Sequence, residues 1–172
     1  MISDSSSASV SSVVSSVVCS TVATLVSSTS TLSVSVIVAN EVAKISGEGK
    51  QGEVCKVLSY DGRFVCLGYI NHLSKIIVRV LSYTEEVIDR QFFFNRIKTA
   101  NDYRLKLGYS DNYRVVFGEA DLLPALIVDK FGDYLSCQFL ALGMEKRKQM
   151  IVDILVKIFN PKGIYERSDV SV

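Results

Sequence analysis

The stretch Glu53–Ile70 constrains the fold more than any other part of this sequence. It reads EVCKVLSYDGRFVCLGYI: apolar and polar residues alternate over Glu53–Leu58, an Asp61-Gly62 pair follows, and a second largely apolar run comes after the pair. Such alternation predicts a strand with one buried face, and Asp-Gly is typical of a tight turn between two strands. Ser74–Leu81, SKIIVRVL, predicts a third strand. Three short strands with tight turns indicate a small β-barrel or sandwich.

The second half of the sequence mixes helical and extended patterns. Glu85–Leu107 predicts a helix, because Phe93, Ile97 and Ala100 recur at helical spacing, and Gly143–Phe159 predicts a second helix. The predicted strands around them are Tyr113–Gly118, Ala125–Asp129, Tyr134–Leu140 and Ile164–Tyr165. We therefore expect an α+β fold, in which a small β-barrel precedes a mixed α/β domain with antiparallel hairpins and two helices.

The first 36 residues have a different composition from the rest. Residues 1–40 hold a single charged residue, Asp4, and every Lys and Arg lies from Lys44 onward. The many β-branched residues favour extended structure, but residues 3–36 contain no Gly or Pro to set turns. An adhesive or spacer element and a poorly ordered leader both fit, and we favour the leader. The expected domains are a Ser/Thr/Val-rich leader over residues 1–36, a barrel portion over 37–83 and an α+β domain over 84–172.

Two patterns resemble functional motifs but are better explained by structure. GEGKQG at Gly47–Gly52 fits G-x-G-x-x-G, yet a predicted strand follows it, so no helix N-terminus would meet a phosphate and we interpret it as a turn. Glu119, Asp121 and Asp129 suggest paired carboxylates for acid–base work. No metal ligand or proton donor accompanies them, so we interpret these carboxylates as partners of turn and backbone groups.

The cysteines, the single histidine and the apolar runs exclude further classes of protein. Cys19, Cys55, Cys66 and Cys137 form no C-x-x-C pair, and His72 is the only histidine, so we expect no zinc or other metal site. We expect reduced thiols in a cytoplasmic protein. No run of about 18 apolar residues is present, so we expect no membrane span.

Basic residues and tyrosines give a weak indication of RNA binding. The net charge of +1 excludes a globally basic nucleic-acid binder. The predicted helix nevertheless carries several cations, and tyrosines lie among them and on the strands before and after. Cations bind phosphates, and aromatic rings can stack on unpaired bases. The cations on the helix are Arg90, Arg96, Lys98, Arg104 and Lys106.

Three segments, taken in order, resemble one known family. Ala39–Ser82 is similar to the later part of its N-terminal PUA-type RNA-binding domain, Tyr113–Lys148 to its middle domain, and Ile164–Val172 to the strand that leads to its third domain. The family is the class I S-adenosylmethionine (SAM)-dependent methyltransferases that make 5-methylcytosine in large-subunit ribosomal RNA. The family usually has Gly-Leu-Pro-Gly where this chain has Leu122 and Ala125 in place of the glycines. Side chains resist positive φ, so we expect a strained or altered loop there.

The resemblance implies an RNA-binding role without catalysis. Large-subunit ribosomal RNA is the expected partner, and Lys75, Arg79, Tyr69 and Asn71 are the expected RNA contacts on the barrel. In the family the catalytic cysteine and the SAM loops belong to a Rossmann-like third domain, which we expect this chain to lack. We therefore expect no catalytic residue and no bound cofactor here, although SAM serves the full-length family. Two alternatives stay open: a noncatalytic scaffold that docks onto a separate methyltransferase, and a nonfunctional truncated product.

Overall fold

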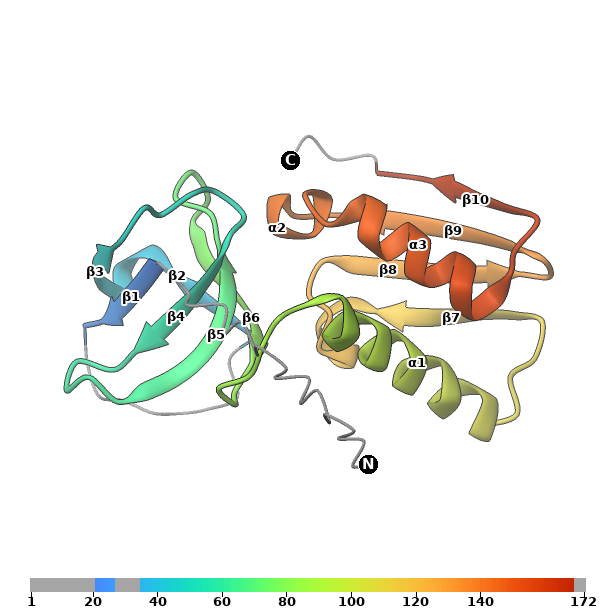
Figure 1. Cartoon of the computed structure of the whole chain (residues 1–172), viewed down its shortest axis with the longest axis horizontal. Coiled ribbons are helices and arrows are strands. Elements are labelled where there is room, and N and C mark those ends of the chain that lie inside the picture. The colour runs from blue at the N-terminus through green and yellow to red at the C-terminus, as the bar shows by residue number, and fades with distance from the viewer. Residues whose placement is uncertain (1–20, 27–34, 169–172) are drawn as a thin grey trace, which may run out of the picture.

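A computed structural model describes residues 21–26 and 35–168, which form two sheets lying side by side (Figure 1). The first sheet has the strand order β2-β6-β5-β4-β1-β3 and curls like an open barrel, and the second has the order β10-β9-β8-β7 with helices across one face. The expected α+β fold is thereby confirmed. The strands are β1 Thr21–Leu25, β2 Val36–Val38, β3 Val42–Ser46, β4 Val54–Leu58, β5 Phe64–Ile70, β6 Ile76–Ser82, β7 Asn112–Phe117, β8 Leu126–Phe131, β9 Tyr134–Phe139 and β10 Gly163–Glu166.

The predicted hairpin forms the centre of the first sheet. Strands β4 and β5 pair antiparallel, and β5 pairs antiparallel with β6. Gly62 adopts a φ of 84°, which glycine tolerates without strain, and its N–H donates to the Ser59 carbonyl across the turn. The inward-facing side chains form one apolar cluster inside the curled sheet; among them are Cys55, Val57, Cys66, Ile70, Ile77 and Val78.

Strand β1 comes from the segment that we set apart as a leader. It pairs antiparallel with β3 and parallel with β4, and Ala23 is fully buried. The Gly49 N–H donates to the Thr21 hydroxyl oxygen at 3.0 Å. Six residues of that segment, Thr21–Leu25 and Val36, therefore belong to the sheet, and the uncharged, β-branched sequence of β1 suits a strand between two others. Residues 1–20 and 27–34 of the expected leader lie outside the described residues.

The first predicted helix is present but starts later than its apolar pattern indicated. Helix α1 spans Arg90–Lys106, and the Asp89 carboxylate caps it by accepting the Phe92 N–H at 2.9 Å. The acidic residues ahead of it have other partners, because Glu85 pairs with Lys56 and Glu86 accepts from the Ser82 hydroxyl. These contacts hold the connection between the two sheets in an extended path.

The second predicted helix is divided into two helices. Helix α2 spans Leu142–Glu145 and α3 spans Lys148–Phe159. Arg147 lies between them with φ −101° and ψ 3°, outside helical geometry. Its guanidinium donates to the Gly52 carbonyl at 2.8 Å and to the Gly143 carbonyl at 2.5 Å. No local sequence pattern indicates this contact between Arg147 and the first sheet. The sequence therefore predicted one continuous helix.

The main core lies between the second sheet and its helices. Residues from α1, α3 and β7 to β9 pack together there, and Tyr69 and Leu81 of the first sheet join the same cluster. The two sheets therefore share part of one apolar core. Two 3-10 turns, Ala39–Glu41 and Gly118–Asp121, complete the regular elements. Within the described residues, no helix is both long enough and apolar enough to cross a membrane.

Candidate nucleic-acid interface

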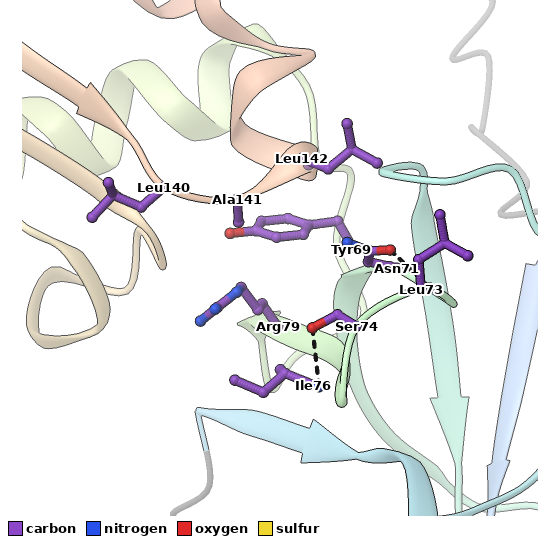
Figure 2. A pocket seen from close by; sticks show the side chains of 10 residues that line it. Tyr69, Asn71, Leu73, Ser74, Ile76, Arg79, Leu140, Ala141 and Leu142 are labelled. Carbon is purple, nitrogen blue, oxygen red and sulfur yellow. Dashed lines mark hydrogen bonds between the residues drawn. The ribbon is translucent and has the colours of Figure 1, made fainter. Parts of the chain in front are cut away.

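A pocket of about 280 Å³ lies where the two sheets meet. Figure 2 shows its lining side chains, which come from the β5–β6 region on one side and from the connection between β9 and α2 on the other. Ligand pockets are frequent at such junctions between structural units. The lining residues are Tyr69, Asn71, Leu73, Ser74, Ile76, Arg79, Leu140, Ala141, Leu142 and Gly143.

Tyr69 forms a rigid wall of this pocket. Its side chain is 2 % exposed, and its hydroxyl donates to the Pro124 carbonyl in the loop before β8 of the second sheet. Gly143 lies against the ring, so closely that a methyl group on Gly143 would be 2.2 Å from two ring carbons. Burial raises the pKa of Tyr69, so the phenol stays neutral and remains a donor. Tyr69 therefore joins the two sheets and cannot serve as an open stacking surface.

Two arginines fix the junction by binding backbone carbonyls on both sides of it. Arg147 donates to Gly52 and Gly143, and Arg96 donates to the carbonyls of Leu81 and Leu122 at 2.7 Å each. Burial lowers the pKa of both guanidinium groups, but arginine stays charged at any physiological pH. Charged hydrogen bonds of this kind are stronger than neutral ones, so the pocket has a preorganised shape.

The polar groups of the pocket are held at its first-sheet side. The Arg79 guanidinium lies 3.2 Å from a Glu119 carboxylate oxygen. The Asn71 side-chain oxygen accepts the Leu73 N–H at 3.0 Å, and the Ser74 hydroxyl oxygen accepts the Ile76 N–H at 3.1 Å (Figure 2). These local bonds fix the direction of each side chain at the turn before β6.

The structure brings three of the four predicted RNA contacts together. Tyr69, Asn71 and Arg79 line the pocket, whereas Lys75 is exposed on the same turn and its carbonyl accepts the Ala39 N–H. Among the described residues, the Lys75 ammonium has no carboxylate partner. Contact with RNA stays a prediction for all four. The opposite wall, Leu140–Gly143, was missed, because no sequence signal links it to a strand some 60 residues earlier.

The helical cations are largely neutralised within the chain. Arg104 makes a bidentate pair with Asp121 at 2.6 and 2.7 Å, and both side chains are mostly buried. Arg90 lies 3.4 Å from Asp153, and Lys98 lies 2.6 Å from an Asp102 oxygen one turn along α1. Groups with such partners are less available to phosphates than the sequence suggested.

The three candidate catalytic carboxylates also have structural partners. Asp121 accepts the Phe117 N–H at 2.6 Å as well as the Arg104 pair, and Asp129 makes a bidentate pair with Arg114 at 2.7 and 3.0 Å. Glu119 pairs with Arg79. The Asp121 contact with the Phe117 N–H fits the backbone role that we expected, whereas Asp129 and Glu119 have arginine side chains as their partners.

The loop that supports the pocket contains two side chains at positive φ. Leu122 has a φ of 56° and Ala125 a φ of 63°, both in the left-handed region. These are the two positions at which the family that this chain resembles has glycine. A side chain at positive φ costs on the order of 1 kcal/mol of conformational free energy. The expected strain is confirmed. Pro124 within the loop accepts the Tyr69 hydroxyl, so the strained segment contacts the pocket wall.

The described cysteines have no features of reactive or metal-binding thiols. Cys55, Cys66 and Cys137 are buried thiols, and burial raises the pKa of Cys66 and Cys137 to about 12. Neutral thiols are poor nucleophiles. No cluster of His, Cys, Asp and Glu suited to a metal ion occurs within residues 21–26 and 35–168. Cys19 lies outside the described residues.

Comparison with known proteins identifies the first sheet. Residues 35–83 match the family described as a PUA-like domain. The chain is 38 % identical over 139 residues to "Ribosomal RNA large subunit methyltransferase I" of Vibrio cholerae, and 34 % identical to the proteins of that name from Vibrio campbellii and Aliivibrio fischeri. Each match covers 79 % of this chain and 35 % of the relative. The chain thus spans about a third of the length of these relatives.

Solved structures agree in fold. A protein assigned as a methyltransferase, in complex with SAH, matches with a TM-score of 0.68 and 15 % identity over 80 % of this chain and 36 % of its own. A protein from Streptococcus mutans assigned as a SAM-dependent methyltransferase matches with a TM-score of 0.62 and 17 % identity, over 69 % and 33 % of the two chains. The expected resemblance is confirmed: residues 35–83 match a PUA-like domain, and over 79 % of its length this chain is similar to proteins named as large-subunit ribosomal RNA methyltransferases.

Proposed function

We propose that this chain is the RNA-recognition portion of a SAM-dependent methyltransferase that makes 5-methylcytosine in large-subunit ribosomal RNA. The observation that carries the proposal is the PUA-like domain over residues 35–83, with a preorganised pocket where it adjoins the second sheet. The names of the relatives support ribosomal RNA as the substrate. The cytosine-5 chemistry rests on the family resemblance alone.

The role we assign to these residues is substrate positioning. Cations of the first sheet, among them the exposed Lys75 and the half-buried Arg79, contact phosphates and set the register of the RNA. The carbonyl contacts of Arg96 and Arg147 keep the two sheets in one arrangement, so a strand bound at the junction has a defined direction. SAM supplies the methyl group when it is bound. No residue described here is proposed to touch the reacting atoms.

Salt-dependent RNA affinity tests this function. A single-stranded segment of large-subunit ribosomal RNA, labelled for fluorescence anisotropy, is titrated with the chain between about 50 and 200 mM salt. The affinity should fall linearly on logarithmic axes. Lys75→Gln should weaken binding for every RNA sequence and reduce the slope by about one. Lys162→Gln is the matched control, since Lys162 pairs with Asp133 beside the second sheet.

Two outcomes would contradict the proposal. Affinity absent at every salt concentration would favour the scaffold alternative, in which the chain only docks onto another protein. Calorimetry that detects tight, stoichiometric SAM binding would show that this portion holds the methyl donor, contrary to the role assigned here.

A further inference from the structure

The polar side chains of the pocket have unused hydrogen-bond donors. The Asn71 oxygen faces the Leu73 N–H, so its amide NH2 is the remaining end, and it has no partner within the described residues. The Ser74 oxygen likewise accepts from Ile76, which leaves its hydroxyl hydrogen. Arg79 uses one nitrogen toward Glu119, and its other nitrogens have no partner in the described chain. The pocket therefore offers a surplus of donors.

The remaining wall of the pocket is apolar. Leu73 and Ile76 lie on the first-sheet side, and Leu140 and Leu142 lie on the other (Figure 2). A free phosphate would gain nothing from aliphatic walls, and Glu119 already offsets part of the Arg79 charge. A flat, weakly polar ring with acceptors on its edge fits both features, because its faces meet the aliphatic groups and its edge meets the donors.

We infer that the pocket holds one unpaired RNA base that presents a carbonyl oxygen, guanine or uracil, and disfavours adenine and cytosine. This inference rests on the proposed function. Guanine offers O6 and N7 and uracil offers O4 as acceptors, whereas adenine and cytosine place an exocyclic amino group at the corresponding position. A pocket donor that faces an exocyclic amino group leaves both groups without an acceptor in a partly buried site. This mismatch costs binding free energy. Only an unpaired base can enter the pocket, because the deep, narrow major groove of paired RNA keeps this edge away from protein side chains.

The inference separates the pocket from the target nucleotide of the proposed function. Cytosine carries an amino group, so a donor-rich pocket suits it poorly. The pocket would instead hold a base that flanks the methylated cytosine and would contribute to the choice of site.

The test uses the whole chain and four oligoribonucleotides of equal length, which differ only at one central base in an otherwise constant single-stranded background. Dissociation constants are measured by fluorescence anisotropy at one salt concentration. Guanine and uracil at the central position should bind roughly tenfold more tightly than adenine and cytosine, the discrimination typical of one well-formed edge contact. The readout is the ratio of the dissociation constants for amino and keto bases. General affinity for phosphates does not change this ratio.

Asn71→Asp provides the sharp variant. It keeps the shape and the oxygen that accepts the Leu73 N–H, but it replaces both amide donors by an acceptor. The ratio should fall to about one or reverse, since an acceptor at this position favours amino groups. Asn112→Asp is the matched control, because Asn112 is exposed on β7, outside the pocket, and the substitution adds the same charge. It should lower affinity for all four oligonucleotides alike and leave the ratio unchanged.

The outcomes distinguish the two levels of the proposal. Wild-type chain that binds all four oligonucleotides equally, with normal salt dependence, overturns the pocket inference and leaves the proposed function intact. Asn71→Asp with an unchanged ratio overturns it as well, provided that the variant melts cooperatively like the wild type. Absence of affinity for any RNA overturns the proposed function and the pocket inference together.

Discussion

Gly143→Ala tests how tightly the two sheets are joined. A methyl group at this position would lie 2.2 Å from Cγ and Cδ2 of the Tyr69 ring, more than 1 Å inside the usual carbon–carbon contact distance of about 3.5 Å. The ring cannot move away easily, because it is 2 % exposed and its hydroxyl is bound to the Pro124 carbonyl. Gly143 lies in α2, where alanine alone would add about 0.5 to 1 kcal/mol of stability.

The clash should exceed that gain. Overpacking of a rigid core costs about 1 to 3 kcal/mol, and an overlap of this size belongs at the upper end. We therefore expect a net loss of about 2 kcal/mol in the free energy of unfolding, a shift of about 1 M in the urea midpoint. Equilibrium unfolding followed by circular dichroism and by tyrosine fluorescence measures it.

A matched glycine and a double mutant complete this test. Gly163→Ala places its methyl group 3.3 Å from the Tyr134 ring, which is 57 % exposed and free to shift, so the free energy of unfolding should change by less than about 0.5 kcal/mol. In a Tyr69→Leu background, Gly143→Ala should cost less than it does in the wild type, because the ring that it meets is gone. A wild-type midpoint for Gly143→Ala alone would refute the described packing of Tyr69 on Gly143.

Two further predictions concern charge and pH. Asp121→Asn leaves the mostly buried Arg104 guanidinium without its bidentate partner and should cost about 2 to 3 kcal/mol in urea unfolding, whereas Asp102→Asn, in an exposed pair on α1, should cost less than about 0.5 kcal/mol; equal costs would contradict this. Burial raises the pKa of Cys66 and Cys137 to about 12, so the unfolded chain loses these protons first. Stability should therefore be unaffected below the ordinary thiol pKa and should fall as pH rises from there toward 12, by about 1.4 kcal/mol per pH unit for each thiol. Urea midpoints measured against pH, compared with a variant carrying alanine at both positions, check this slope, and identical profiles would contradict it.

Local patterns predicted most of the regular elements. The hairpin of β4 and β5, strands β6 to β9 and the helical stretch of α1 follow from alternation, turn residues and apolar spacing. The predictions were wrong where contacts with residues distant in the sequence determine the local structure. Glu85 and Glu86 contact the first sheet and its last residues instead of starting α1, and Arg147 reaches the Gly52 carbonyl and ends the continuity between α2 and α3.

The pairing of β1 shows the same limit. Thr21–Leu25 has the composition of a strand, but no residue near it in the sequence indicates which strands it pairs with. Its partners, β3 and β4, follow some 20 and 30 residues later, and only the curled sheet places β1 between them. A segment judged by composition alone therefore looked separate from the barrel.

The sequence by itself determined the α+β class, the order of most elements from β4 onward and the resemblance to a methyltransferase family with a PUA-type domain. It also predicted RNA contacts at Tyr69, Asn71, Lys75 and Arg79, which lie on β5, on β6 and in the turn between them. Only the tertiary structure decided that this turn faces Leu140–Gly143 across a pocket, and that Tyr69 is a buried wall of it. The physical reason is that periodicity and turn chemistry act over a few residues, whereas a pocket depends on packing between surfaces whose contact no local pattern records.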